Sequence, residues 1–417
     1  PPVEGHAATT LTTRGRVLAE LGAFGAYACY RTGQPVFLLL CCVAATAMLV
    51  SVLFARRLAG GLAAARSAPD WAYAGEPLTI RLRLTNLGPA KYLFSVIDEA
   101  RVGARRCTAA MRVDVLRSAE RRVLGYVLPA PRRGLHRYAG LRVESGGPFG
   151  LIRSAATVAA PGSVLIVPRP GRARGWELPG GRRNSGIGAE SPERGGASLE
   201  YFASREYRSE DPMRFIHWKL TARMRRPMVR EFLTTSSLEV EVVPDLCAAD
   251  YRESPDGRLL EAVIGLAATL CGELVRHGAI VRLWLLRERP RAAPQGSGAR
   301  HLKKMLAELA VAEADAVTEY AAALSEASRR FAPGSAVVSV VAARALADAP
   351  AALASLRRAG HAGQLMVVHA AGTVATNMSR PWPEVVAAVA ARAGVPAWTF
   401  PGDGDMRDVE MPRLRAR

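Results

Sequence analysis

Cysteine, lysine and aromatic residues are all scarce in this chain of 417 residues. Six cysteines without C-x-x-C or Cys/His spacing exclude a disulfide-built scaffold and argue against a structural zinc site. Four of the 56 basic residues are lysines and the rest are arginines, a usage typical of a GC-rich coding bias. The net charge of +19 still predicts non-specific attraction to anionic lipid or nucleic acid.

Known catalytic motifs are missing as well. The sequence has no H-E-x-x-H, G-x-S-x-G or G-x-x-x-x-G-K-[S/T] pattern, and its seven histidines are spread along the chain. Gly186 and Gly188 lie in a Gly-, Arg- and Ser-rich stretch that no strand precedes, which argues against a phosphate-binding loop. The sequence therefore predicts no catalytic residues and no cofactor, and we expect the protein to be non-enzymatic.

One long hydrophobic run is present, from Pro35 to Phe54, and it contains no charged residue. At about 1.5 Å per residue, it is long enough to cross a hydrocarbon core of about 30 Å. The alternative is a buried core helix, which the apolar character on every side disfavours. A cleaved signal peptide is disfavoured by the length of the run and by the lack of a cleavage site after it. Residues 35–54 are thus expected to contact membrane lipid.

The segment before this run, Val17 to Tyr30, is shorter and contains Glu20. It is either the first span of a helical hairpin or an amphipathic segment at the membrane surface. Basic residues flank the two segments and are retained on the cytoplasmic side of membranes. They are Arg14, Arg16, Arg56, Arg57 and Arg66. Either arrangement predicts an inner (plasma) membrane protein whose soluble domains are cytoplasmic.

Residues 67–170 show the two-residue period of β-strands. Between Glu76 and Asn86, Leu78, Ile80, Leu82 and Leu84 alternate with polar residues, as in a half-buried strand. Further strand-like runs, separated by Pro and Gly, are Arg122–Leu128, Gly140–Glu144 and Ser163–Val167. Short strands with turn signals between them predict an antiparallel β-sandwich-like domain.

Residues 236–417 alternate between strand and helix patterns. The expected strands are Leu238–Pro244, Ala279–Leu286, Ser335–Val341, Gln364–His369 and Pro396–Phe400. The expected helices are Leu259–Arg276, Leu302–Ala312, Tyr320–Phe331, Leu346–Arg358 and Pro383–Arg392. This alternation predicts an α/β domain with a parallel sheet covered on both faces.

The segment from Leu199 to Phe232 mixes aromatic and apolar residues with many charges. Asp211 followed by Pro212 is a helix-start signal, with Asp as the N-cap. Phe215, Trp218 and Ala222 then recur at helical spacing, and Arg214 lies one turn before Trp218, which permits a cation–π contact. The alternative is an amphipathic helix with surface ion pairs.

This segment resembles the signature of the domain of unknown function 58 family. The resemblance is carried by Arg205-Glu-Tyr207, Asp211-Pro212, Arg214, Ile216, Trp218-Lys219 and Ala222-Arg223, and upstream by Gly147-Pro-Phe-Gly-Leu151 and Val167-Pro-Arg-Pro170. Glu210 departs from the family, which commonly has Gly there. The family has no established enzymatic activity. The resemblance implies a membrane-anchored partner or adaptor of a MoxR-type AAA+ ATPase, in complex assembly or envelope stress, with a C-terminal domain similar to the von Willebrand factor A domain.

The von Willebrand A-like fold can carry a metal site built on Asp-x-Ser-x-Ser after its first strand. Here the Asp is Asp245, but Cys247 and Ala249 occupy the two Ser positions and supply no hydroxyl. The sequence therefore favours Asp245 as a loop cap over a metal ligand. Two alternative functions stay open: a metal-dependent hydrolase using Asp245 with Asp250, Asp403 and Asp405, or a basic nucleic-acid-binding protein, although no aromatic stacking platform is evident.

The expected organisation has four parts: a membrane anchor (1–66), a β-sandwich-like domain (67–170), a linker with the family signature (171–235) and the von Willebrand A-like α/β domain (236–417). We expect seven signature residues to hold the junction between the β-rich part and the α/β domain, with Trp218 packed and Asp211 near Arg214. They are Arg205, Tyr207, Asp211, Arg214, Trp218, Lys219 and Arg223.

The charge distribution makes a topological prediction. A reporter fused after Arg417 should report a cytoplasmic location, because the basic residues that flank the apolar run favour that side. Paired fusions to a cytoplasmic reporter and to one active only outside the cytoplasm would measure this. Activity of the second reporter alone would reverse the predicted orientation.

Overall fold

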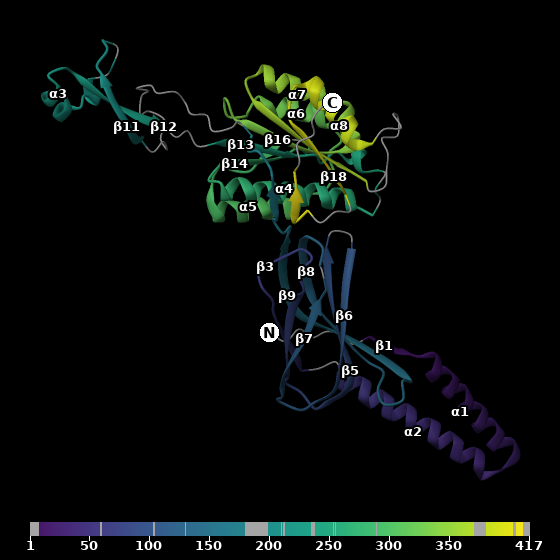
Figure 1. The fold of residues 1–417 in the computed structure, drawn as a ribbon. Coiled ribbons are helices and arrows are strands. Elements are labelled where there is room, and N and C mark those ends of the chain that lie inside the picture. Colours follow the sequence, from purple (N-terminus) through teal and green to yellow (C-terminus); the bar gives the residue numbers. More distant parts are fainter. Residues whose placement is uncertain are drawn as a thin grey trace. The chain divides into compact units, whose positions relative to one another are not determined.

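The computed structural model describes residues 8–58, 61–102, 105–129, 131–179, 199–209, 211, 213–234, 238–252, 254, 256–288, 290–370, 381–402 and 406–411. The chain divides into two compact units, residues 1–167 and 168–417. The first contains a helical hairpin and two β-sheets, and the second contains the α/β fold (Figure 1). Each unit is described separately.

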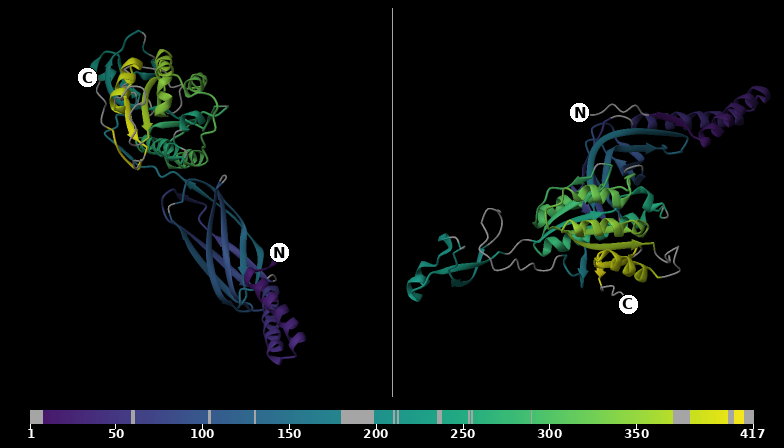
Figure 2. Two further views of the ribbon diagram at one scale, coloured as in Figure 1. Left: turned by 90° about the vertical axis from the view of Figure 1, so that its right-hand side faces the viewer. Right: turned by 90° about the horizontal axis from the view of Figure 1, so that it is seen from above.

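The first unit contains two antiparallel helices, α1 (Thr13–Thr32) and α2 (Pro35–Leu58), which lie side by side (Figure 2). Glycines let them approach closely, since a Cβ on Gly25 would lie only 3.2 Å from the Cys41 sulfur. The two helices therefore form a hairpin, while the expectation that the first one is a membrane span stays a prediction. Among the described residues, α2 alone has a segment, Pro35–Ala55, that is long and apolar enough to span a membrane, and only 11% of its most apolar window is buried.

Two sheets follow the hairpin. One has the order β1-β9-β8-β5-β6, with β3 also paired to β9, and the other has the order β2-β4-β7. The strands are β1 (Ala8–Leu11), β2 (Leu62–Ser67), β3 (Trp71–Tyr73), β4 (Leu78–Asn86), β5 (Lys91–Val102), β6 (Arg105–Leu116), β7 (Arg121–Leu128), β8 (Gly134–Ser145) and β9 (Ile152–Val167). The predicted alternation in β4 is confirmed: its four inward aliphatic side chains share one core with Phe94, Val96 and Leu141 of the other sheet.

A buried ion pair joins the two sheets. Arg66 in β2 and Asp98 in β5 lie 2.5 Å apart, and their side chains are 2% and 0% exposed. Tyr126 in β7 donates a hydrogen bond of 2.7 Å to Asp98, and the Arg66 guanidinium lies 4.1 Å from the centre of the Tyr138 ring. Arg66 also donates to the carbonyl of Ala160. The prediction that Arg66 flanks the membrane span is therefore wrong, because this arginine is inside the β-rich core.

The turn 147–151 connects the helical hairpin to the sheets. The hydroxyl of Thr12, the N-cap of α1, donates to the carbonyl of Gly150 (2.7 Å), and the Thr12 N–H donates to the carbonyl of Leu151 (3.0 Å). Gly15 is required for this approach, since a Cβ there would lie 2.2 Å from the Leu151 oxygen. Leu151 also packs with Ala55 of α2. The Gly147–Leu151 element thus fixes the base of the hairpin.

The second unit contains a sheet of order β15-β14-β13-β16-β17-β18, parallel except for β15. Helices cover both faces, with α4 and α5 on one side and α6, α7 and α8 on the other (Figure 1). The strands are β13 (Glu239–Pro244), β14 (Ile280–Leu285), β15 (Arg291–Ala292), β16 (Ala336–Ala342), β17 (Ala362–His369) and β18 (Ala397–Pro401). The helices are α4 (Arg258–Arg276), α5 (Gly298–Ala310), α6 (Tyr320–Ser328), α7 (Ala349–Arg358) and α8 (Trp382–Ala393). The predicted parallel sheet with helices on both faces is confirmed.

The start of the predicted linker belongs to this α/β body. Strand β10 (Arg172–Arg174) pairs in parallel with β19 (Asp408–Glu410). The N–H of Gly171 donates to the hydroxyl of Thr269 in α4, at 3.0 Å. Residues 171–174 are therefore anchored to the fold.

The buried ion pair leads to a stability prediction. Asp98→Ala should destabilise the β-rich part by about 3–5 kcal/mol, because it leaves the Arg66 guanidinium buried without its partner. Arg106→Gln is the matched control, since the Arg106–Glu99 pair is exposed (63% and 37%) and should contribute no more than about 1 kcal/mol. Denaturant unfolding of the purified variants measures both changes. Equal, small losses would show that the buried pair contributes no more than the exposed one.

Candidate functional site

The family signature forms a β-hairpin with two short helices between its strands. Strands β11 (Leu199–Glu206) and β12 (Met228–Thr234) are antiparallel, and Glu206 lies opposite Met228. A 3-10 helix, η1 (Met213–Phe215), and helix α3 (Trp218–Met224) lie between them. The segment 199–234 is called the signature hairpin below.

Asp211 accepts several hydrogen bonds within the signature hairpin. Its carboxylate accepts two hydrogen bonds of 2.6 Å from the Arg205 guanidinium and one of 2.8 Å from the Arg208 N–H. The bond from Arg205 is the main cause that lowers the pKa of Asp211. The expected pairing with Arg214 and the expected cap on the helix are therefore wrong. Helix α3 begins later, at Trp218, and its N-cap is His217, whose Nδ1 accepts from the Leu220 N–H at 3.0 Å.

The packing inside the signature hairpin differs from the prediction. Ile216, Met228 and Val229 are buried, whereas Trp218 is 67% exposed. The hairpin itself does not bury Trp218, and the expected packing of this side chain at the junction with another part of the chain stays a prediction. The Arg214 guanidinium lies 5.0 Å from the centre of the Phe215 ring, so the structure shows a cation–π contact with Phe215. Tyr207 closes the hairpin, since its N–H donates to the carbonyl of Pro227 at 2.9 Å.

One stretch of the signature hairpin, residues 213–226, combines exposed apolar and basic side chains. Met213 (72%), Trp218 (67%) and Met224 (45%) are exposed. The stretch contains five basic residues and no acidic one. The basic residues, all exposed, are Arg214, Lys219, Arg223, Arg225 and Arg226. Arg226 pairs with Glu206. Neither methionine is among the predicted signature residues, although the lack of any acidic residue is visible in the sequence.

Whether the signature residues hold a junction between the β-rich part and the α/β domain stays a prediction. Glu210 and Pro212 lie outside the described residues. Within the hairpin, Arg205 and Asp211 pair with each other, whereas Arg214, Trp218, Lys219 and Arg223 are exposed.

The second candidate is the end of strand β13, where the strand order of the parallel sheet reverses. Open α/β sheets commonly bind ligands at this edge. Asp245 lies there with no exposed surface. Its Oδ1 accepts from the Cys247 N–H at 2.9 Å, and its Oδ2 is 3.4 Å from the Ala342 N–H. Asp245 therefore connects the loop after β13 to the end of β16. It caps this loop, as the sequence predicted.

Two neighbouring carboxyl groups, those of Asp245 and Asp250, lie at this edge of the sheet. Burial, together with the nearby charge of Asp250, raises the pKa of Asp245 to about 8, and burial also raises the pKa of Asp250. The two carboxyl groups therefore retain one proton between them near neutral pH. Among the described residues, no group of three or more His, Cys, Asp or Glu side chains is placed to hold a metal ion. Asp403 and Asp405 lie outside the described residues.

Comparison with known proteins finds one family model that matches part of the chain. Residues 203–371 match the family model described as "Protein of unknown function DUF58", which covers most of the signature hairpin and much of the α/β body. The resemblance to this family is confirmed. A relative from Bacillus subtilis (strain 168), named "Uncharacterized protein YeaD", is 24% identical over 249 residues. The match covers 58% of this chain and 60% of the relative's length.

Several solved structures resemble parts of the chain. The CARDB domain of the PF1109 protein from Pyrococcus furiosus matches with a TM-score of 0.18 and 15% identity, over 25% of this chain and 87% of that one. A β-glucosidase from Listeria innocua matches with a TM-score of 0.16 and 18% identity, over 25% of this chain and 16% of that one. Proximal thread matrix protein 1 from the mussel byssus matches with a TM-score of 0.28 and 9% identity, over 41% and 45%.

The raised pKa of Asp245 predicts a pH dependence of stability. An unfolded Asp releases its proton near pH 3.9, whereas the folded pair holds one up to about pH 8. Between these values the folded state binds more protons, so stability should fall as the pH rises, by up to about 1.4 kcal/mol per pH unit. Asp245→Asn, which mimics the protonated acid, should flatten this slope.

Denaturant unfolding at several pH values within this window measures the slope. Asp256→Asn is the matched control: the pKa of the exposed Asp256 is lowered, chiefly by the Arg258 N–H, so this carboxyl titrates below the window. A slope that survives in Asp245→Asn would assign the pH dependence to other groups.

Proposed function

We propose that this protein is a non-enzymatic, membrane-anchored binding module, a partner or adaptor of a MoxR-type AAA+ ATPase. Helix α2 would anchor it in the inner membrane, with the other domains in the cytoplasm. The ATPase as partner comes from the resemblance to the domain of unknown function 58 family. The observation that carries a binding role is the exposure of Met213, Trp218 and Met224 beside basic residues in the signature hairpin.

Exposed side chains of this kind are typical of protein-binding surfaces. Trp, Met and Arg are enriched at protein interfaces, and a few buried aromatic or Arg anchors usually contribute most of the binding energy. Methionine adapts its shape to an irregular partner surface. The internal ion pair of Arg205 and Asp211, together with the small core of Ile216, Met228 and Val229, supplies a scaffold that holds this surface in place.

We further propose that the α/β domain is von Willebrand A-like. Numbered along the chain from β13, the strands of its sheet have the order 3-2-1-4-5-6, with one antiparallel edge strand, and this order supports the assignment. The proposed domain would act without a metal ion, because Cys247 and Ala249 replace the hydroxyl ligands. Its role would then be to bind or position a partner.

Trp218→Ala tests the binding role. We expect a change in unfolding free energy within about 0.5 kcal/mol, because the side chain is largely exposed. Binding to the MoxR-type ATPase of the same cell should weaken by about 2 kcal/mol or more, roughly thirtyfold, as for an interface anchor. Thermal melting and a pull-down of the purified ATPase, made on the same preparation, give both readings.

Two variants control this experiment. Val317→Ala removes an apolar side chain that is 81% exposed and lies outside the hairpin, so it should leave binding unchanged. Asp211→Ala breaks the pair with Arg205 and should lower both the stability of the hairpin and binding. Full binding by Trp218→Ala would refute the proposed surface, and a loss of stability in that variant would give Trp218 a structural role.

A further inference from the structure

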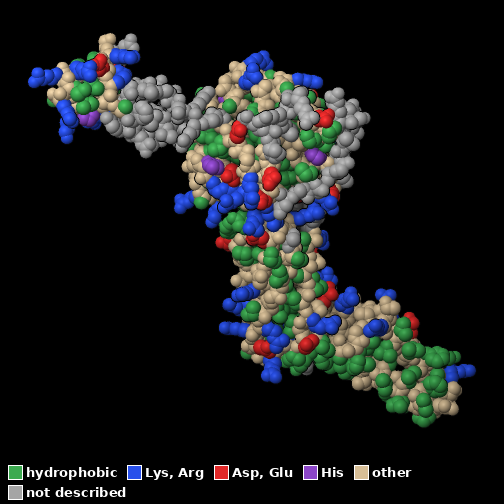
Figure 3. All heavy atoms as spheres, in the orientation of Figure 1, with side chains coloured by type: hydrophobic (Ala, Val, Ile, Leu, Met, Phe, Trp, Pro, Cys, Tyr) green, Lys and Arg blue, Asp and Glu red, His purple; other side chains and the backbone are tan. Residues whose placement is uncertain are grey.

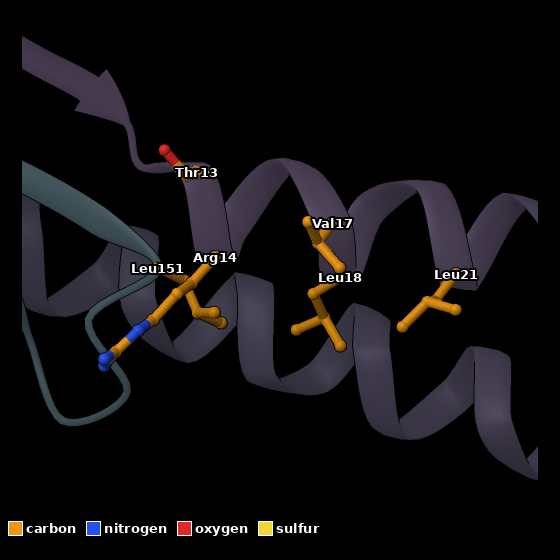
Figure 4. A pocket seen from close by; sticks show the side chains of 6 residues that line it. All are labelled: Thr13, Arg14, Val17, Leu18, Leu21 and Leu151. Carbon is orange, nitrogen blue, oxygen red and sulfur yellow. The ribbon is translucent and has the colours of Figure 1, made fainter.

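A hollow lies at the base of the helical hairpin, beside the turn 147–151 (Figure 4). Its volume is about 330 Å³. The residues that line it are Thr13, Arg14, Val17, Leu18 and Leu21 of α1 and Leu151 of the turn. The lining is almost entirely apolar, and Arg14 supplies its one charged side chain (Figure 4). From the sequence, Arg14 was predicted only to flank the first helical segment.

The position of the hollow along helix α2 indicates which layer of a membrane would surround it. Leu151 packs against Ala55, the last residue of the candidate span Pro35–Ala55. The 21 residues of that span are about 31 Å long, close to the thickness of a hydrocarbon core. The hollow therefore lies at one end of the span, where acyl chains give way to headgroups. Phe149, on the same turn, is 53% exposed, as is common for aromatic residues at this level.

The apolar part of the hollow continues along the outer face of α1. Val17 (49%), Leu21 (52%) and Phe24 (64%) are exposed at helical spacing on that face. An acyl chain from a lipid would cover this strip without any rearrangement of the protein. A water-soluble ligand would leave most of the strip exposed.

Arg14 gives the hollow its charge. Its guanidinium lies near the turn, with one nitrogen 3.9 Å from the position a Cβ on Gly150 would take. Within the part of the chain that the structure describes, no ion pair to Arg14 is found. A guanidinium matches the geometry of a phosphate, which it can bind through two parallel hydrogen bonds.

We propose that this hollow binds one anionic phospholipid, whose acyl chain lies on Val17, Leu18 and Leu21 and whose phosphate contacts Arg14. The site would fix the base of the hairpin at the headgroup level of the membrane. This inference rests on the membrane anchor in the proposed function and does not involve the ATPase.

The test uses the full chain in mild detergent, with an equimolar mixture of a phosphatidylglycerol and a phosphatidylcholine. Native mass spectrometry counts the lipids of each class that stay bound. We expect phosphatidylglycerol to be retained preferentially, and Arg14→Gln to reduce its retention about fivefold, the size expected for one Arg near an anionic surface. Leu21→Trp, which fills the hollow and keeps the charge, should reduce retention as well.

Arg16→Gln is the matched control. It makes the same change of charge on the same helix, but Arg16 lies about 200° around the helix from Arg14 and does not line the hollow. Equal losses in both Arg variants, or no preference for phosphatidylglycerol, would overturn the site. Displacement of the lipid by millimolar inorganic phosphate would also overturn it, because the ligand would then be a free anion. A chain that purifies without detergent and carries no lipid would refute the membrane anchor itself.

Discussion

The first unit depends on a cation that is buried between two sheets. Removing Arg66 and Asp98 from water costs several kcal/mol for each charge, and only a complete set of partners offsets this. The partners come from both sheets: Tyr126 donates to Asp98, and the Arg66 guanidinium contacts the Ala160 carbonyl and the Tyr138 ring. Because these partners come from both sheets, the pair helps to fix how the sheets face each other. The fixed sheets then hold the turn between β8 and β9 that receives the helical hairpin.

Two buried carboxyl groups in this protein are stabilised in opposite ways. Asp98 has a cation at 2.5 Å, so its charge is balanced inside the core. Asp245 has a second carboxyl, Asp250, as its neighbour, and burial raises its pKa to about 8, so a proton replaces the cation. A protonated carboxyl can still cap a loop, and Asp245 does so by accepting a hydrogen bond from the Cys247 N–H. Each carboxyl connects two separate segments of the fold, Asp98 to Arg66 of β2 and Asp245 to the end of β16.

Local patterns predicted the elements of the α/β body, but they did not predict its long-range contacts or those of the other parts. Strands such as β16 are buried throughout and apolar except for one Ser, and they alternate with amphipathic helices, so each element could be recognised from its own residues. The partner of Arg66 is 32 residues away, and a strand pattern cannot show that an arginine faces inward toward it. In the signature hairpin, the Asp-Pro pair looked like a helix start. Asp211 instead accepts a bidentate pair of hydrogen bonds from Arg205, which lies in strand β11.

The signature residues therefore fall into two groups: those that stabilise the hairpin and those that do not. Arg205 and Asp211 satisfy each other, and Tyr207 closes the strands through its backbone, so the fold of the segment explains their presence. Trp218, Lys219 and Arg223 are exposed and lie on a stretch without acidic residues, so the stability of the hairpin does not explain them. An exposed Trp contributes little to folding, but it loses much apolar area to a partner that covers it. A single motif thus combines a scaffold with a surface, and the surface is the part that a binding partner would recognise.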